Sequence, residues 1–238
     1  MDAAEMLMFL PGLICDSRMY APQQSAFPDA IVVDGYGMAD SLAEMARIAL
    51  AQADERGAEK LDVFGHSMGG RVAMEVVRLA PHRVRRLALV STGIHPVGEN
   101  EPAKRAELQK IGYDNGFETL VDTWLPPMVA DANRDTPEYA VMREMCLSKG
   151  QAMFDAQIKA LLGRPPFDDL LARLTCPTLV MTGELDAWAP PSQHETIASK
   201  LANSHLVIVP GAGHMIQLEA PDAVNRAVSD WLAMPADG

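Results

Sequence analysis

The sequence of 238 residues contains little cysteine. Its three cysteines, Cys15, Cys146 and Cys176, lie far apart and show neither C-x-x-C spacing nor any other metal-ligand spacing. An odd number of cysteines cannot all pair within one chain, so a disulfide framework is not expected. Reduced thiols predict a protein of the cytoplasm.

Positive charge is also scarce. There are 20 Lys and Arg residues against 32 Asp and Glu, which gives a formal net charge of −12. Nucleic acids and anionic membranes are bound by cationic surfaces, so we expect neither as a partner. The acidic balance favours solubility, with steering of a cationic substrate as the alternative.

Long hydrophobic runs are missing. No run approaches 18 apolar residues, so no transmembrane helix is predicted. The apolar segment 6–15 follows Asp2 and Glu5, is interrupted by Pro11 and lacks a small-residue cleavage site, which argues against a signal peptide. Motifs for zinc proteases, phosphate loops and dinucleotides are absent too, so we expect no metal and no cofactor.

What the sequence does contain is a regular alternation of two patterns. Short apolar runs predict strands at 6–10, 30–36, 61–65, 86–92, 178–183 and 205–211. Segments of helical period predict helices at 41–57, with Ser41 as N-cap, then up to Leu79, and again from Pro221 through Leu232. Nearly continuous hydrophobic strands are typical of a parallel sheet with helices on both faces, so we predict a doubly wound α/β fold.

The pattern changes between residues 95 and 175. This region consists of helix-like segments without any strand-like run, as in QAMFDAQIKALLG. We therefore predict a core formed by residues 1–94 and 176–238, with residues 95–175 as a helical lid inserted into it.

One motif points to chemistry. The sequence GHSMG, residues 65–69, places Ser67 between Gly65 and Gly69 where a predicted strand passes into a predicted helix. A serine on such a turn has its hydroxyl exposed at the carboxyl end of the sheet, and the glycines allow strand and helix to approach closely. The motif alone is weak, but its setting between strand and helix favours a nucleophile.

A serine hydroxyl needs a base, and the base needs an orienting acid. Asp186 follows the predicted strand 178–183, and His214 follows the strand 205–211. Parallel strands bring their carboxyl ends to one edge, so Ser67, Asp186 and His214 are expected to meet. Glu184 is a rival acid, and His95 is a candidate for ligand contact.

Acyl transfer also requires donors for an oxyanion. One is expected to be the backbone N–H of Met68, directly after the nucleophile. The second is expected from the loop after the first strand, where Gly12 allows the backbone of this loop to approach the reacting serine closely. The N–H of Leu13 is the first choice and that of Ile14 the second.

The chain resembles the lidded esterase-like enzymes of the α/β-hydrolase fold. GHSMGG, GELDAWAP and GAGHMIQLEAP match that pattern in order and spacing, although Pro11-Gly12 stands where many relatives carry His-Gly. The resemblance implies a serine carboxylesterase acting on a small-molecule ester. Other enzymes of this fold cleave thioesters, enol-lactones and carbon–carbon bonds next to carbonyls. The segment GGRVAM (69–74) also resembles the branch of cofactor-free lyases in menaquinone biosynthesis. A non-catalytic receptor is the remaining alternative.

The predicted pocket lies between lid and strand ends. Trp124, Met128 and Trp188 are its candidate lining residues and favour small to medium apolar esters. Arginines in the lid are candidates for binding a substrate carboxylate, although solvated helix faces explain them equally well. These arginines are Arg134, Arg143 and Arg164.

Overall fold

The apolar runs form a single six-stranded sheet in the computed structural model, which describes residues 4–236. The strands are β1 (Glu5–Leu10), β2 (Ile31–Val32), β3 (Lys60–His66), β4 (Val84–Val90), β5 (Thr178–Gly183) and β6 (Ser204–Val209). They are all parallel, in the spatial order β2-β1-β3-β4-β5-β6. The direction of winding reverses between β1 and β3. Open parallel sheets bind ligands outside the carboxyl ends of their strands at such a reversal.

The strand predictions differ from the structure mainly at β2. The run 30–36 was expected to form a strand of seven residues, yet only Ile31 and Val32 pair with β1. The chain then turns through Gly35 and Gly37, whose φ angles of 91° and 55° are incompatible with an extended strand. Strand β5, in contrast, has the predicted bounds and is buried along its whole length.

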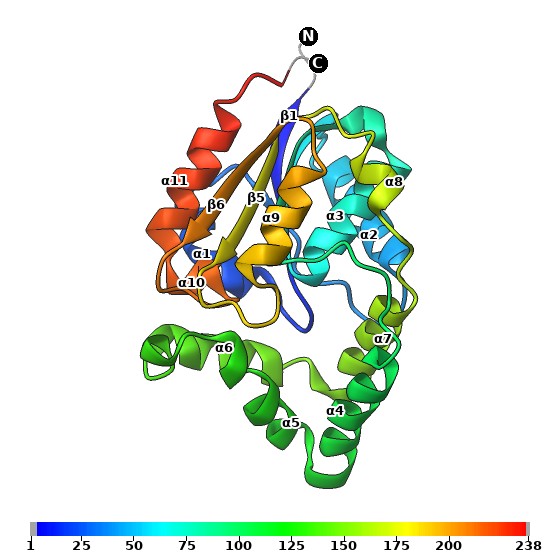
Figure 1. Ribbon diagram of the computed structural model, residues 1–238, viewed down its shortest axis with the longest axis vertical. Helices are drawn as coiled ribbons and strands as arrows, with labels where there is room; N and C mark the ends of the chain where they lie inside the picture. The colour runs from blue at the N-terminus through cyan, green and yellow to red at the C-terminus, as the bar shows by residue number, and fades with distance from the viewer. Residues whose placement is uncertain (1–3, 237–238) are drawn as a thin grey trace.

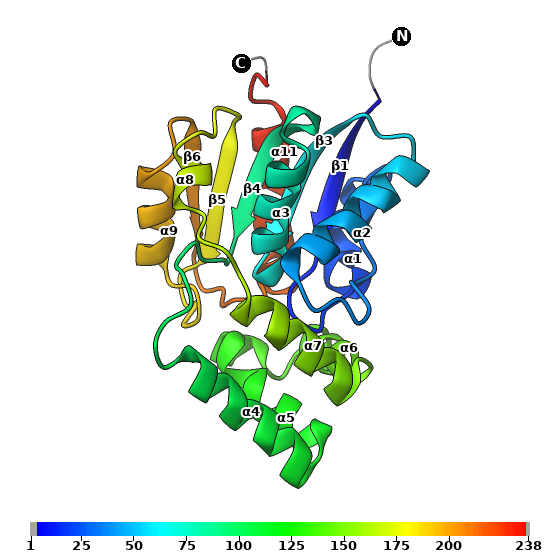
Figure 2. The ribbon, with the colours of Figure 1, turned by 90° about the vertical axis from the view of Figure 1, so that its right-hand side faces the viewer.

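Helices cover both faces of the sheet, as Figures 1 and 2 show. One face carries α1 (Ala21–Ala26), α10 (Ile216–Glu219) and α11 (Pro221–Leu232), and the other carries α2 (Leu42–Glu55), α3 (Met68–Leu79) and α9 (Pro191–Ser199). Helix α2 begins as predicted, because the Ser41 hydroxyl accepts the N–H of Glu44 at 3.2 Å. The predicted doubly wound α/β fold is confirmed.

The segment between β4 and β5 contains helices and no strand among its described residues. We call α4 to α7 the cap helices; they are α4 (Glu101–Asn115), α5 (Phe117–Trp124), α6 (Pro137–Leu147) and α7 (Gly150–Leu162). They form a layer beyond the carboxyl ends of the strands (Figure 2). The short helix α8 (Asp168–Leu171) lies instead beside α3, and the Arg78 guanidinium lies 5.5 Å above the Phe167 ring. The boundaries 95–175 remain a prediction.

Within residues 4–236, no helix combines the length and the apolar character that crossing a bilayer requires.

Candidate active site

The turn between β3 and α3 holds Ser67 in an unusual conformation. Its φ is 55° and its ψ is −117°, a region that residues with a side chain rarely adopt. The turn is tight enough that a Cβ on Gly65 would lie 2.4 Å from the Gly69 carbonyl oxygen, and one on Gly69 would lie 2.2 Å from that of Leu10. Both glycines are therefore required where strand, turn and helix meet.

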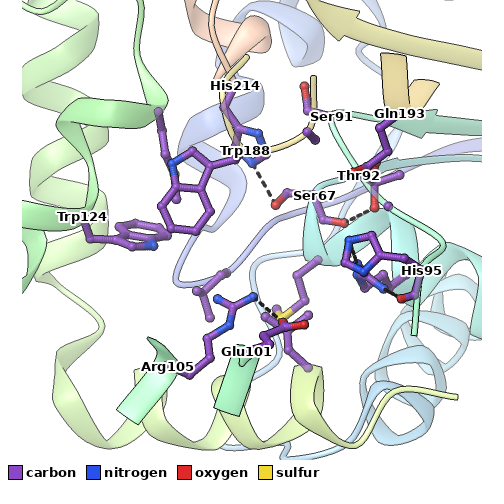
Figure 3. Close-up of a pocket in the computed structure, with 17 residues that line it drawn as sticks. Ser67, Ser91, Thr92, His95, Glu101, Arg105, Trp124, Trp188, Gln193 and His214 are labelled. Carbon is purple, nitrogen blue, oxygen red and sulfur yellow. Dashed lines mark hydrogen bonds and ion pairs between the residues drawn. The ribbon is translucent and has the colours of Figure 1, made fainter. Parts of the chain in front are cut away.

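The structure brings the three predicted side chains together. The Ser67 hydroxyl oxygen lies 2.9 Å from Nε2 of His214, and Nδ1 of His214 lies 2.8 Å from Oδ2 of Asp186 (Figure 3 shows the contact with Ser67). Asp186 and His214 are both buried. The rival Glu184 is exposed and accepts the N–H of Gly211.

Asp186 is held as a carboxylate by its surroundings. Burial acts to raise its pKa, but the adjacent His214 imidazole and two backbone N–H groups outweigh burial and keep the pKa well below its usual range. Those N–H groups belong to Trp188 and Ala189 and lie 2.9 and 2.8 Å from Oδ1, while the Thr182 hydroxyl lies 3.2 Å from Oδ2. A charged Asp186 fixes a proton on Nδ1 of His214, which leaves Nε2 free to accept one.

The predicted donors for an oxyanion border the same cavity. Leu13 and Met68 line it together with Ser67 and His214. The N–H of Ile14, the second choice, is occupied, because it donates to Oε1 of Gln157 at 2.7 Å. Leu13 and Met68 therefore stay the predicted donors.

Two further residues support His214 and were not found from the sequence. Nε2 of His66 donates to the His214 carbonyl oxygen at 2.8 Å, so this ring lies behind the base. Burial, and secondarily His214, lowers the pKa of His66 to about 3, so the ring is neutral.

Glu219, the last residue of α10, is the second supporting residue. One oxygen accepts the Met215 N–H at 3.0 Å, and the other accepts the Gly213 N–H at 3.0 Å, so both neighbours of His214 are bound. The second oxygen also accepts the Ala130 N–H and the Asn133 side chain, which come from the segment between the cap helices α5 and α6. Glu219 therefore ties the His214 loop to that segment.

The cavity above Ser67 measures about 170 Å³. Its apolar wall includes the three predicted residues: Trp124 and Met128 are buried, and Trp188 is 41% exposed at the opening. In Figure 3 the two tryptophans lie on the side of Ser67 that is nearer His214. His95, the predicted ligand contact, also lines the cavity.

The opposite wall is charged, which the sequence did not predict. Arg71, one turn along α3 from Ser67, lines the cavity and is 7% exposed. It has no ion pair with any carboxylate of residues 4–236 and reaches only the backbone oxygen and ring of His95, at 3.4 and 3.5 Å. Burial, and then the nearby Arg164, lowers the pKa of Arg71 to about 9, which leaves it protonated at neutral pH. Arg71 is thus a buried cation that forms no ion pair within residues 4–236, although the charge of Glu101, which lines the same cavity, acts to raise its pKa.

The arginines of the predicted lid differ in their burial and in the carboxylates that they bind. Arg164 is buried and bonded to Glu101, and Arg105, which lines the cavity, lies 3.1 Å from the same carboxylate. Arg134 pairs with Asp131 and Arg143 with Glu118 and Asp122, all near the surface. None of the three predicted arginines is among the cavity's lining residues. In the part of the chain that is described, no cluster of three or more His, Cys, Asp or Glu residues is arranged to hold a metal ion.

Comparison with known proteins agrees with this architecture. The sequence model of the alpha/beta hydrolase family matches residues 7–227. The chain belongs to the alpha/beta hydrolase family.

Three similar proteins illustrate the range of this family. The 2-hydroxy-6-oxononadienedioate/2-hydroxy-6-oxononatrienedioate hydrolase 2 of Pseudomonas putida is 28% identical over 188 residues, covering 75% of this chain and 65% of that enzyme. The hydrolase of the same name from Escherichia coli K12 is 25% identical, covering 92% of this chain and 81% of the enzyme. A malate-bound thermophilic esterase from Thermogutta terrifontis has a TM-score of 0.86 at 26% identity, covering 97% of this chain and 89% of that one. The relatives thus include both esterases and other hydrolases.

Proposed function

We propose that this alpha/beta hydrolase is a serine hydrolase that cleaves small carboxylic esters. The observation that carries the proposal is the continuous contact from Asp186 through His214 to Ser67, with distances of 2.8 and 2.9 Å. A serine placed on a strained turn beside an imidazole is the arrangement that activates a hydroxyl as a nucleophile.

The reaction proceeds in two halves. Ser67 attacks the ester carbonyl carbon while His214 accepts its proton, and the N–H groups of Leu13 and Met68 bind the resulting oxyanion. His214 then returns the proton to the alcohol, which leaves an acyl group on Ser67. Water, activated by His214, releases the acid. Asp186 orients the imidazole and stabilises its cation throughout.

The preferred substrate carries a carboxylate near its ester. A buried arginine without an anionic partner is costly, and a carboxylate ligand supplies that partner. Arg71 lines the cavity with Ser67 and has no such partner in the described chain, and Arg105 lines it as well. The sequence alone favours small to medium apolar esters, and Arg71 is the observation that favours an added carboxylate here. It agrees with the dicarboxylate in the names of the curated relatives and with the malate in the similar esterase.

A second candidate is hydrolysis of a carbon–carbon bond next to a ketone. The hydrolases from Pseudomonas putida and Escherichia coli are named for dioate substrates, and the same Arg71 favours such anions here. In that reaction His214 protonates a carbon leaving group, which must hold its electron pair as an enolate. Ester cleavage remains the first proposal because its leaving group needs no such stabilisation.

Turnover of p-nitrophenyl esters tests the proposal. We expect the wild type to hydrolyse the esters from acetate to decanoate. It should prefer a half-ester of a short dicarboxylic acid over the neutral ester of equal length. The variant Ser67→Ala should have a kcat at least about 1,000-fold lower than the wild type. Activity that survives in Ser67→Ala would refute the assignment of Ser67 as the nucleophile. Ester turnover below detection, with cleavage of a keto acid at a carbon–carbon bond, would establish the second candidate instead.

A further inference from the structure

The loop that carries the oxyanion donor Leu13 contains a strained turn. The N–H of Cys15 donates to the Gly12 carbonyl oxygen at 3.2 Å, which defines a β-turn over residues 12–15. Ile14, the third residue, has a φ of 47°, whereas Leu13 is not among the described residues with positive φ. That combination is the signature of a type II turn, whose third position normally holds glycine. A β-branched side chain there is strained, so the surroundings must hold it.

The bond that holds this turn comes from the cap helices. The Ile14 N–H donates to Oε1 of Gln157 at 2.7 Å, across 143 residues of sequence. Gln157 belongs to α7, and both residues are buried. On the other side of the same peptide, the Leu13 carbonyl oxygen accepts from Sγ of Cys15 at 3.3 Å. The peptide between Leu13 and Ile14 is therefore fixed at both of its polar ends.

The alternative to this turn is a type I turn. It relieves the positive φ of Ile14 by rotating the Leu13–Ile14 peptide through about half a turn. Rotation would exchange the positions of the N–H and the carbonyl, so the amide oxygen of Gln157 would face a carbonyl oxygen. The bond to Gln157 thus opposes the relaxation that the strain of Ile14 favours. The flip alone leaves the Gly12–Leu13 peptide, which carries the Leu13 N–H, in its plane. The Leu13 N–H moves when the turn over residues 12–15, released from Gln157, shifts as a whole relative to Ser67.

We propose that Gln157 is a positioning residue for the oxyanion hole, through which the cap helices hold the Leu13 N–H in place. The inference rests on the proposed serine hydrolase function. Gln157 is not among the residues that line the cavity. Its effect passes through the peptide of Ile14, so the cap helices are part of the catalytic geometry as well as a cover for the cavity.

Three variants compared on one p-nitrophenyl ester test this role. Gln157→Leu removes the acceptor at nearly constant volume, Gln157→Glu keeps an acceptor oxygen, and Gln151→Leu is the matched control. Gln151 lies on the same helix, and its Nε2 donates to Oδ1 of Asp155 at 2.9 Å, a bond within α7 itself. We expect Gln157→Leu to lower kcat by about 10- to 100-fold with KM within about twofold, because a misplaced donor acts on the transition state. Gln157→Glu should recover most of the loss, and Gln151→Leu should change kcat by less than about threefold.

A kcat for Gln157→Leu within about threefold of the wild type would overturn the proposal, as would an equal fall in the Gln151 control. Amide hydrogen exchange of the wild type adds a test that needs no variant. The Ile14 N–H should exchange slowly, and rapid exchange would refute the bond even if Gln157→Leu does not fold.

The two proposals can fail separately. If the wild type cleaves no ester, the ester proposal fails. Labelling of Ser67 by a fluorophosphonate then replaces turnover, because its phosphoryl oxygen enters the same hole. Slower labelling of Gln157→Leu, with Gln151→Leu unchanged, would still support the role of Gln157, whereas equal labelling rates would overturn it.

Discussion

Replacing Arg71 by methionine should make the protein more stable and less selective. The Arg71 side chain is 7% exposed and has no ion pair in residues 4–236. Its pKa is lowered from 12.5 to about 9, chiefly by burial. A shift of this size corresponds to roughly 5 kcal/mol against the charged form. This is an upper bound, because relaxation and water reduce such penalties. Methionine keeps most of the length and apolar contact of the arginine stem.

We therefore expect Arg71→Met to raise the free energy of unfolding by about 1–3 kcal/mol, the range seen when buried charges are replaced by apolar residues. For a chain of 238 residues this corresponds to a rise in Tm of about 3–8 °C in a calorimetric scan at pH 7. Arg143→Met is the matched control, since Arg143 is bonded to Asp122 near the surface. Its free energy of unfolding should change by less than about 1 kcal/mol.

The same substitution should remove recognition of carboxylates. Succinate at about 100 times its Kd should stabilise the wild type by about 2.7 kcal/mol and leave Arg71→Met unchanged. The preference for a dicarboxylic half-ester over its neutral analogue should fall at least about tenfold, which corresponds to the loss of one charged hydrogen bond. A lowered Tm would refute the reasoning on burial. An unchanged preference would refute the assignment of Arg71 to the substrate.

Two further predictions concern the support of His214 and the response to acid. Glu219→Gln should lower kcat about 5- to 20-fold and the free energy of unfolding by about 1–3 kcal/mol, because an amide NH2 group then faces backbone N–H donors that a carboxylate oxygen accepts in the wild type. The control is Glu184→Gln, which alters one exposed bond to Gly211. It should change neither the activation free energy nor the free energy of unfolding by more than about 0.5 kcal/mol. The pKa values of His66 and His194 are lowered by burial from 6.5 to about 3 and about 4, so the stability that depends on their neutral forms is complete above pH 6.5 and is lost as the pH falls below it. Urea unfolding between pH 7 and 4.5 should show a decrease of up to about 1.4 kcal/mol per pH unit for each ring, less steep in His194→Gln, and a flat profile would contradict the prediction.

The positions of Ser67, Asp186 and His214 were predictable because parallel strands bring their carboxyl ends to one edge. The order of residues along the chain then determines which loops meet. The length of β2 was overestimated for a local reason. Apolar content continues past Val32, but the positive φ of Gly35 ends the strand, and hydrophobic pattern alone does not report φ.

The proposed roles of Arg71 and Gln157 were not predictable from the sequence pattern. Each depends on which partners are present or absent in three dimensions. Arg71 is notable because no carboxylate of the described chain pairs with it, whereas Arg164, which looked similar in sequence, is bonded to Glu101. A local signal existed for Arg71, since it occupies the first turn of the helix that begins directly after Ser67. No local signal marks Gln157, whose partner is a backbone N–H 143 residues away.

The bonds between the core and the segment 126–157, which ends in the cap helix α7, support the proposal that the two parts act as one catalytic unit. Every proposed reacting side chain comes from the core, yet two backbone groups and one side chain near them are bonded to the segment 126–157. The Ile14 N–H donates to Gln157, the His214 N–H donates to the Met128 carbonyl oxygen at 2.7 Å, and Glu219 accepts the Ala130 N–H. These contacts reach the oxyanion loop on one side of Ser67 and the base on the other. Changes in the cap helices should therefore alter kcat as well as substrate choice, because moving them displaces both the donor and the base.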